Sequence, residues 1–211
     1  MLRSRSTFRL PWLAAILLAC ASAHAGSAGY RYDTVHSQIL FSITHDGYSR
    51  PFGRLHIARG WLRFDPDDWS KSATVLDIDL AGLDMGDADW NKAVLRPAFL
   101  DAAHARYAHF ASTSVQRTDD RHGVLHGQLT LRGITRPVSL AFTFNRLGET
   151  IFGLHTVAGF AATTTLDRSD FGMTAFRHSI GQQMTVWLEI EAIRDDHAGP
   201  ADAGPAGKDR L

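Results

Sequence analysis

The side chains best suited to chemistry form one short cluster, Arg168-Ser169-Asp170-Phe171-Gly172-Met173. The planar fork of donors on arginine matches phosphate and carbonyl oxygens, so Arg168 and Asp170 are candidates to hold the polar head of a ligand. A second interpretation stays open, because such a pair beside a glycine turn also bonds internally or caps the turn backbone. In that case Phe171 and Met173 would plug one end of the fold, and Gly172 would adopt a backbone conformation closed to other residues.

Histidines are the second group that could support chemistry, and the sequence holds 11 of them. His36 and His45 are unusual within an apolar stretch. His45 could share a metal with His109 or His126 if their strands were neighbours, because imidazole suits zinc, copper and haem iron. These histidines lack the close spacing with acids that is typical of metal sites, so hydrogen-bonded polar histidines are the favoured interpretation. We predict no metal and no cofactor.

Motifs of common enzymes are missing from the sequence. It contains no Gly-x-Ser-x-Gly elbow, no phosphate-binding glycine loop and no His-Glu-x-x-His helix. Acidic pairs such as Asp67-Asp68 and Asp119-Asp120 flank predicted turns, where solvated loop caps explain them. The 22 basic and 22 acidic residues form no basic stripe for nucleic acid. We therefore predict neither an enzyme nor a nucleic-acid-binding protein.

Residues 1–25 have the layout of a secretory signal peptide, with a basic start, an apolar centre and a small-x-small cleavage site. These parts are Arg3, Arg5 and Arg9, then Leu10 to Leu18, then Ala23-His24-Ala25. The apolar run is shorter than the roughly 20 residues of a membrane-spanning helix. We expect cleavage after Ala25. The alternative is lipidation at Cys20, since Leu17-Leu18-Ala19-Cys20 partly resembles a lipoprotein box, and the domain would then be tethered to a membrane.

Residues 26–194 have the pattern of one domain without a repeat or linker. Alternating apolar residues predict about eight strands joined mostly by hairpins. The inward positions begin at Val35, Leu55, Leu76, Tyr107, Leu125, Val138, Ala158 and Met184. A bulge is expected at Arg59-Gly60. Between the third and fourth strands, Asp87 or Asp89 should cap a short helix that ends before Pro97. Residues 195–211 are rich in Ala, Gly, Pro and Asp, which predicts a disordered tail.

The fold class that follows is all-β, with the eight antiparallel strands closed into one barrel and the short helix covering one end. Closure removes the two free edges that an open sheet would expose. A barrel of this size either fills its interior with side chains or holds one small ligand. Small inward residues, Gly127, Ala158, Gly159 and Ala162, favour a cavity, but they could also accommodate large neighbours such as Phe41 and Phe142. Both interpretations remain open.

Four blocks of the sequence, in order, resemble the YceI-like family of bacterial periplasmic proteins. They are Asp33-Thr34-Val35-His36-Ser37 with Phe41, His45 and Phe52-Gly53; Asp89 to Arg96 with Phe99, Asp101 and Tyr107 to Ser112; Gly127 to Thr135; and Arg168 to Met173 with Ile180-Gly181. The chain departs from the family at Tyr107-Ala108, where proline often follows the tyrosine, and at Asp89-Trp90-Asn91-Lys92, where arginine and aspartate are usual. The second departure leaves open any ligand contact made by that loop.

The resemblance implies a lipocalin-like barrel that encloses a polyisoprenoid, with the polar head of the lipid near the opening. The ligand-binding residues expected on this basis are Ile39, Phe41, Ile43, His45, Leu55, Phe142, Phe160, Arg168, Asp170, Phe171, Val186 and Leu188. The expected partner is an isoprenoid lipid or quinone carried in the periplasm, with transient membrane contact. An outward Trp187 would suit a homodimer face. Two alternatives stay open: a histidine-bearing metal- or haem-linked accessory of a membrane cytochrome, and a barrel with a filled interior.

Overall fold

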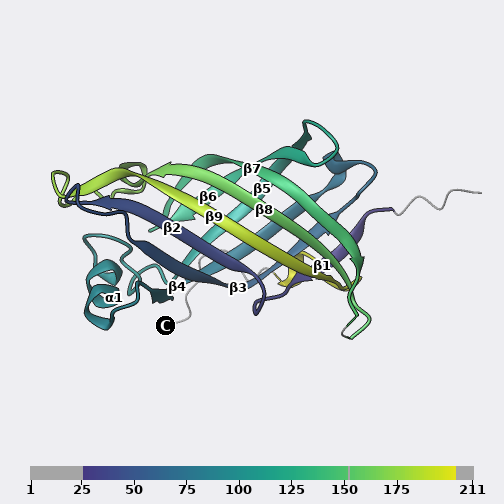
Figure 1. Cartoon of the computed structure of the whole chain (residues 1–211), viewed down its shortest axis with the longest axis horizontal. Helices are drawn as coiled ribbons and strands as arrows, with labels where there is room; N and C mark the ends of the chain where they lie inside the picture. The colour runs from purple at the N-terminus through teal and green to yellow at the C-terminus, as the bar shows by residue number, and fades with distance from the viewer. Residues whose placement is uncertain (1–25, 152, 203–211) are drawn as a thin grey trace, which may run out of the picture.

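The computed structural model describes residues 26–151 and 153–202 of the 211-residue chain. Within that part, nine strands belong to a single sheet (Figure 1). Their bounds are β1 (Ala28–Tyr32), β2 (Gln38–His45), β3 (Phe52–Phe64), β4 (Ala73–Asp84), β5 (Tyr107–Arg117), β6 (His122–Leu131), β7 (Ile134–Glu149), β8 (Thr156–Asp167) and β9 (Ile180–Arg194). The predicted signal peptide with Cys20, and residues 203–211 of the predicted tail, lie outside the described residues.

The sheet closes on itself. Its strand order is β1-β3-β2-β9-β8-β7-β6-β5-β4, and a further pairing of β3 with β4 joins the two ends. All of these pairs are antiparallel. The prediction of a closed antiparallel barrel is therefore confirmed, with its wall formed by β2 to β9. β1 is an additional short strand that pairs with both β3 and β9.

The start of the domain differs from the sequence expectation in two respects. β1 has only 5 residues, which is too short for the alternation pattern to predict it. The pattern also predicts Val35 on the first strand, but Val35 is 80% exposed and lies in a turn before β2. The turn forms because Asp33 Oδ1 accepts the backbone N–H groups of Val35 and His36, at 2.9 and 3.1 Å. Hydrogen bonds from these N–H groups to an aspartate side chain compete with the bonds that would pair the segment with a neighbouring strand.

The middle of β3 contains the expected irregularity. The pairing of β3 with β4 shifts register between Ile57 and Arg59, next to the predicted bulge. Gly60 follows with φ of 150°, and a Cβ atom there would approach the carbonyl oxygen of Val75 to 2.4 Å. Only glycine tolerates this combination of backbone angle and close approach. The bend allows β3 to curve around the barrel.

One end of the barrel is covered by α1 (Ala88–Leu95), at the left of Figure 1. The Asp87 side chain caps this helix by accepting the N–H groups of Asp89 and Trp90, at 3.0 and 2.9 Å. The predicted helix and its cap are thus confirmed. After the helix, the Leu100 N–H donates to the Val94 carbonyl at 3.0 Å, which folds the following segment back against α1. This arrangement places apolar side chains of the helical segment over the barrel interior.

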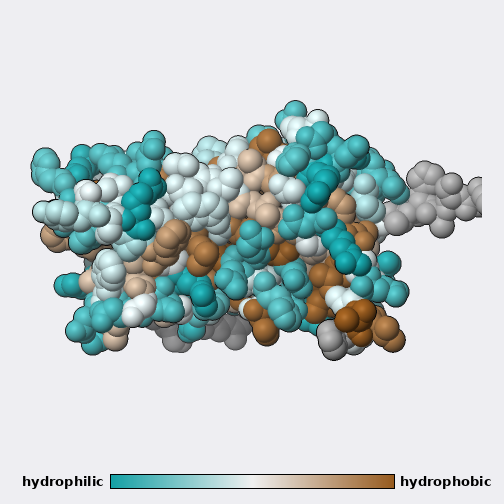
Figure 2. All heavy atoms as spheres, viewed as in Figure 1, coloured by the Kyte–Doolittle hydropathy of each residue, from teal (hydrophilic) through white to brown (hydrophobic). Residues whose placement is uncertain are grey.

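The opposite end of the barrel holds β1, the 3-10 turn η1 (Trp69–Lys71) and the described part of the C-terminal segment. The Asp195 N–H donates to the Gly29 carbonyl at 2.9 Å, and η3 (Pro200–Asp202) follows. Residues 195–202 therefore turn back against β1, although their composition predicts disorder. Ile151 and Leu154 in the β7–β8 turn are 87% and 80% exposed, and Figure 2 shows hydrophobic spheres at this end of the molecule among hydrophilic ones. In the described residues, no helix has the length and apolar character needed to span a bilayer.

Candidate ligand-binding site

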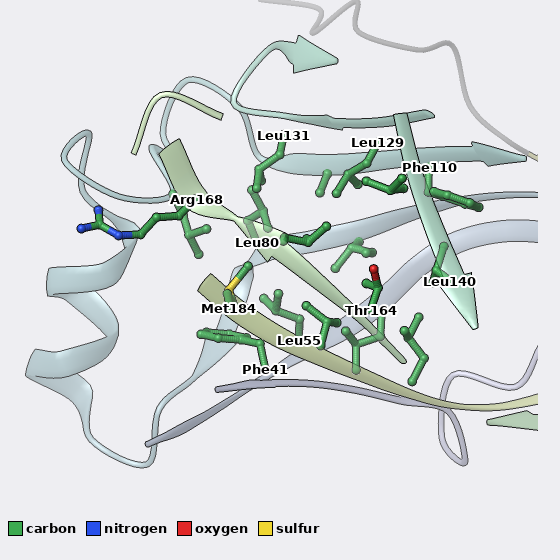
Figure 3. Close-up of a pocket in the computed structure, with 18 of the residues that line it drawn as sticks. Phe41, Leu55, Leu80, Phe110, Leu129, Leu131, Leu140, Thr164, Arg168 and Met184 are labelled. Carbon is green, nitrogen blue, oxygen red and sulfur yellow. The ribbon is translucent and has the colours of Figure 1, made fainter. Parts of the chain in front are cut away.

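A cavity of about 560 Å³ occupies the barrel interior. Every strand and α1 contribute to its wall, because the inward positions of each strand alternate with outward ones. Figure 3 shows apolar side chains from several strands, such as Leu55, Phe110 and Leu140, converging on this space. Of the two interpretations left open by the sequence, a filled or a hollow barrel, the structure supports the hollow one.

The predicted ligand-binding residues lie on this wall, with two exceptions discussed below. Those that line the cavity are Ile39, Phe41, Ile43, His45, Leu55, Phe142, Phe160, Arg168, Val186 and Leu188. The small residues play different roles. Ala162 lines the cavity, whereas the space that a side chain at Gly127 would fill is occupied by the Phe110 ring, within 2.4 Å of the Cβ position. Both of the roles considered for small residues are therefore present.

An aromatic cluster closes the end of the cavity that lies near β1. It consists of Phe64, Trp69, Phe142, Phe144 and Phe160, with ring centroids of contacting pairs 5.1 to 6.2 Å apart. Phe64 and Trp69 are each 2% exposed. Aromatic pairs at these distances contribute beyond their buried area. We call this group the aromatic plug, and it blocks passage through the barrel.

The opposite end, next to α1, is the mouth of the cavity. Its lining includes His45, Asp46 and Arg96, which are polar and reach solvent. Two ring contacts border it: His45 lies edge-on to Trp90 at 5.8 Å, and Phe99 stacks on Phe176 at 5.8 Å with 15° between the planes. The cavity thus has one blind end, closed by the aromatic plug, and one polar, partly aromatic opening.

Arg168 lines the cavity near the mouth, but its donors are directed to the protein backbone. Nε donates to the Gly181 carbonyl at 2.8 Å, and Nη1 donates to the Met173 carbonyl at 2.6 Å. Nη2 donates to the carbonyls of Ala175 and Ile180, at 2.7 and 3.1 Å. The side chain is 3% exposed, and burial, with the charge of Arg177, lowers the pKa of Arg168. Figure 3 shows its guanidinium turned away from the apolar side chains.

These contacts correct the expectation that Arg168 and Asp170 hold a ligand head. Arg168 ties the segment before β9 to the end of β8, which is the backbone-capping alternative. Asp170 is exposed and is not part of the cavity wall. It lies in the 3-10 turn η2 (Arg168–Phe171), whose residues do not alternate between two faces as strand residues do. Gly172 ends this turn with φ of 75°, as expected.

Phe171 is the second exception among the predicted residues. It is 1% exposed and belongs to the apolar core, together with Leu166 and Met173, but it does not reach the cavity. Phe171 therefore lies outside the wall of the cavity in which the ligand is expected. Its packing instead supports the wall from behind, while Met173 faces the cavity.

A small polar group at the blind end was not anticipated from the sequence. Tyr32, Ser72 and Thr74 line the cavity there. The Tyr32 hydroxyl is hydrogen-bonded to Thr74 Oγ1, and Thr74 Oγ1 donates to the Trp61 carbonyl at 2.8 Å. Burial raises the pKa of Tyr32 to about 12, although the hydrogen bond to Thr74 opposes this shift. The alternation of Tyr30 and Tyr32 was the available signal, but it lies in the strand that was not predicted.

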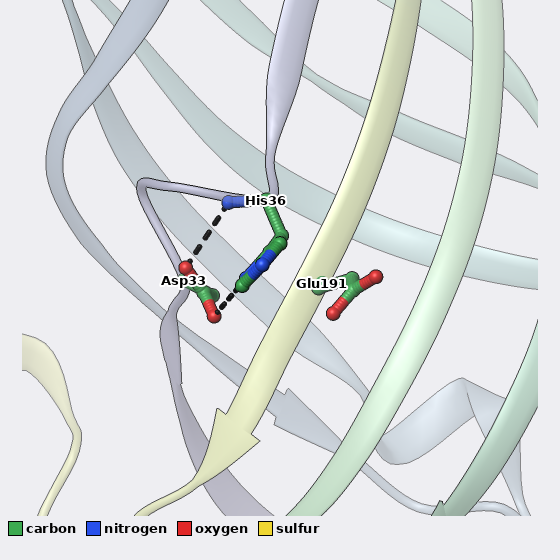
Figure 4. A group of neighbouring side chains, drawn as sticks. All are labelled: Asp33, His36 and Glu191. Carbon is green, nitrogen blue, oxygen red and sulfur yellow. Dashed lines mark hydrogen bonds and ion pairs between the residues drawn. The ribbon is translucent and has the colours of Figure 1, made fainter. Parts of the chain in front are cut away.

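The histidines considered for a metal site are not gathered together. Among the described residues, the group that brings three potential ligand atoms within 4.8 Å of one another is Asp33, His36 and Glu191, and it contains neither His45, His109 nor His126 (Figure 4). His36 Nδ1 and Asp33 Oδ2 are 2.8 Å apart. His109 instead pairs with Asp77 at 2.6 Å, and His126 with Ser139 at 2.8 Å. His36, His109 and His126 are each hydrogen-bonded to a neighbouring side chain, as the favoured interpretation predicts.

Comparison with known proteins places this fold in a family. The sequence profile of the YceI-like domain matches residues 30–192. The chain belongs to the YceI-like family. A UPF0312 protein of Ectopseudomonas mendocina is 33% identical over 186 residues, which cover 86% of this chain and 97% of that protein. A UPF0312 protein of Pseudomonas putida is 33% identical over 190 residues, covering 90% of this chain and 98% of the relative.

Solved structures share the fold of this YceI-like chain. BcnA of Burkholderia cenocepacia superimposes with a TM-score of 0.67 at 18% identity, covering 76% of this chain and 98% of BcnA. A polyisoprenoid binding domain from Saccharophagus degradans, implicated in plant cell wall breakdown, superimposes with a TM-score of 0.59 at 13% identity, covering 80% of this chain and 99% of that domain. At such identities the similarity establishes the YceI-like barrel and not the ligand.

Proposed function

We propose that this YceI-like protein is a non-catalytic carrier that encloses an isoprenoid lipid, of the polyprenyl or isoprenoid quinone type, inside its barrel. The observation that carries this proposal is the cavity itself, about 560 Å³ in volume, lined mainly by apolar side chains and blind at the aromatic plug. Its blind end suits an elongated ligand that enters through one mouth. The fold shared with the polyisoprenoid binding domain of Saccharophagus degradans supports the same ligand class.

The energetics of such binding come mainly from buried hydrocarbon. Each CH₂ group transferred from water contributes about 0.8 kcal/mol, so a chain of several isoprene units would gain on the order of 10 kcal/mol before the costs of association. Apolar wall residues discriminate weakly between similar chains, whereas polar groups fix orientation. The cavity is therefore suited to hold a class of lipids, with selectivity concentrated at its two polar ends.

The proposed place of action is the periplasm, reached through the signal peptide that the sequence predicts at residues 1–25. Loading from a bilayer would require transient contact at the mouth. Phe176 is 64% exposed there, and Tyr48, in the β2–β3 turn at the same end, is 93% exposed. Exposed aromatic side chains around an opening are suited to contact with a lipid interface. Exchange of the lipid would follow without any chemical step.

Mass spectrometry of an organic extract from the untagged mature protein tests this proposal directly. The expected result is an isoprenoid lipid in the extract, absent from a mock purification of cells that lack the protein. Delipidated protein should then bind a fluorescent prenyl probe and lose it to an added prenyl quinone. An extract without lipid, combined with no binding of either added compound, would overturn the proposal.

A further inference from the structure

The polar group at the blind end of the cavity has a defined hydrogen-bonding direction. Thr74 Oγ1 donates its single hydrogen to the Trp61 carbonyl, at 2.8 Å. The Tyr32 hydroxyl is bonded to the same Thr74 oxygen, so Tyr32 must be the donor in that second bond. The hydrogen of Tyr32 is thereby committed. Its oxygen retains an acceptor site in the cavity wall.

The protonation of Tyr32 supports this assignment. Burial raises the pKa of its phenol to about 12, so the hydroxyl keeps its proton across the neutral range. Tyr32 is 8% exposed and Thr74 is 5% exposed in the ligand-free barrel. The remaining lone pair of the Tyr32 oxygen can accept a further hydrogen bond from a donor on a ligand in the cavity.

Ser72 adds a second polar atom of the opposite kind. Its Oγ accepts the backbone N–H of Asp65 at 3.1 Å, which leaves the Ser72 hydrogen able to donate. Ser72 and Thr74 are two residues apart in an extended segment, so both side chains lie on the inward face. An acceptor on Tyr32 and a donor on Ser72 together match a group that both donates and accepts, which is a neutral hydroxyl.

The distance between these polar side chains and the mouth determines which end of the ligand can reach them. β4 begins at Ala73 beside the polar group and ends at Asp84 near α1. At about 3.3 Å per residue, Thr74 and Asp84 are separated by roughly 33 Å along the strand. A polar atom at the blind end therefore cannot contact a ligand head that stays at the mouth. It can contact only the end of the ligand that enters first.

We propose that the cavity takes isoprenoid ligands with a neutral hydroxyl head, such as a polyprenyl alcohol or a hydroquinone, and binds them head first, with the hydroxyl at Tyr32 and Ser72 and the tail directed to the mouth. This inference rests on the proposed function and specifies its substrate. A charged phosphate head would stay at the mouth, because burying an ionised group beside the aromatic plug costs far more than one hydrogen bond returns. An oxidised quinone head offers no donor to Tyr32 and would bind more weakly than its reduced form.

The test compares geranylgeraniol with its methyl ether, which differ in the hydroxyl hydrogen. Delipidated protein should bind the alcohol about two- to tenfold more tightly, the range that one hydrogen bond provides. Tyr32→Phe should remove this preference while leaving the affinity for the ether unchanged. Tyr30→Phe is the matched control, since Tyr30 lies two residues away in β1 and does not line the cavity. Its alcohol preference should equal that of the wild type.

Thr74→Val provides a second, independent variant. Without the threonine oxygen, the Tyr32 hydrogen is released toward the cavity, so the ether should gain affinity and the alcohol preference should shrink or reverse. Binding of geranylgeranyl phosphate should be the same in Tyr32→Phe and in the wild type. Thermal unfolding of each variant establishes that it is folded before its affinities are compared.

The outcomes separate this inference from the proposed function. If neither the alcohol nor the ether binds to wild-type protein, the proposed carrier function fails. If both bind equally to wild type and to Tyr32→Phe, the carrier function stands and the head-first orientation is overturned. A loss of phosphate binding in Tyr32→Phe would likewise overturn it, because a charged head would then reach the blind end.

Discussion

Phe99 and Phe176 stack across the mouth of the cavity, with their ring centroids 5.8 Å apart and their planes 15° from parallel. The two residues come from distant segments, one after α1 and the other in the loop before β9. Phe176 adopts a φ of 53°, a left-handed conformation that is uncommon for a bulky side chain. Backbone strain of this kind concentrates at ligand clamps and switch regions. The stacked pair is thus placed to retard ligand passage.

Phe176→Ala should speed the release of a bound prenyl probe by about two- to tenfold, since an aromatic pair contributes roughly 0.5–1.5 kcal/mol. Stopped-flow fluorescence after mixing with excess unlabelled lipid measures this rate. Arg177→Ala serves as the control, because Arg177 is exposed in the same loop and does not line the cavity. Equal release rates for Phe176→Ala, Arg177→Ala and wild type would show that the pair does not gate the mouth.

Arg168 should contribute to stability rather than to ligand selection. A lysine at position 168 cannot satisfy all four backbone carbonyls between residues 173 and 181, so we expect Arg168→Lys to lower the free energy of unfolding by about 3 kcal/mol or more. Urea unfolding followed by tryptophan fluorescence gives this value. Arg177→Lys, at an exposed position nearby, should change it little. Unchanged stability in Arg168→Lys, with a loss of binding for ligands with phosphate heads, would restore the head-group role.

The barrel was predictable because each wall strand alternates strongly between inward apolar and outward polar residues. β9 shows this plainly, with Met184, Val186 and Leu188 facing the cavity between residues that face outward. The helix cap was predictable for a similar reason, since Asp87 acts within its own turn. Features that depend on residues close together in the chain can therefore be predicted from the sequence.

The direction in which a polar side chain turns was not predictable. The acceptors of Arg168 are backbone carbonyls of residues 173–181. Every residue type carries such a carbonyl, so the side chains of this segment do not reveal that it binds Arg168. Likewise, the group of Tyr32 and Thr74 joins residues separated by 42 positions, through a strand too short to predict. Sequence patterns locate the wall of such a cavity well and its polar contacts poorly.

Partly filling the cavity should weaken binding without unfolding the barrel. Ala162→Phe adds a ring at an inward position of β8, whereas Ala161→Phe makes the same change on the outward face of the same strand. Displacing two or more CH₂ groups of the ligand weakens binding by about tenfold or more. Probe titration should show this loss for Ala162→Phe alone. Equal affinities in the two variants would place the ligand outside the barrel.

Two aspartate–histidine pairs offer a matched test of local electrostatics. The hydrogen bond and then the charge of Asp33 raise the pKa of His36 above its ordinary value of 6.5, and Asp101 acts in the same way on His104. In each pair the histidine follows its aspartate by three positions, and the histidine Nδ1 lies 2.8 Å from a carboxylate oxygen of the aspartate. Asp33→Asn should therefore lower the pKa of His36 and leave that of His104 unchanged. Asp101→Asn should do the reverse.

The sign of the pH dependence follows from the direction of these shifts. Because the folded pKa of His36 lies above its unfolded value, its favourable contribution is complete below the unfolded pKa and disappears as pH rises through the folded pKa. For Asp33, burial raises the pKa, but the hydrogen bonds from His36 and Val35 together lower it by more, so the net shift is downward. The contribution of Asp33 to stability therefore disappears as pH falls through the lowered pKa. Nuclear magnetic resonance titration of the imidazole protons in wild type and both variants measures these pKa values. A His36 pKa that does not respond to Asp33→Asn would show that the pair is not formed in solution.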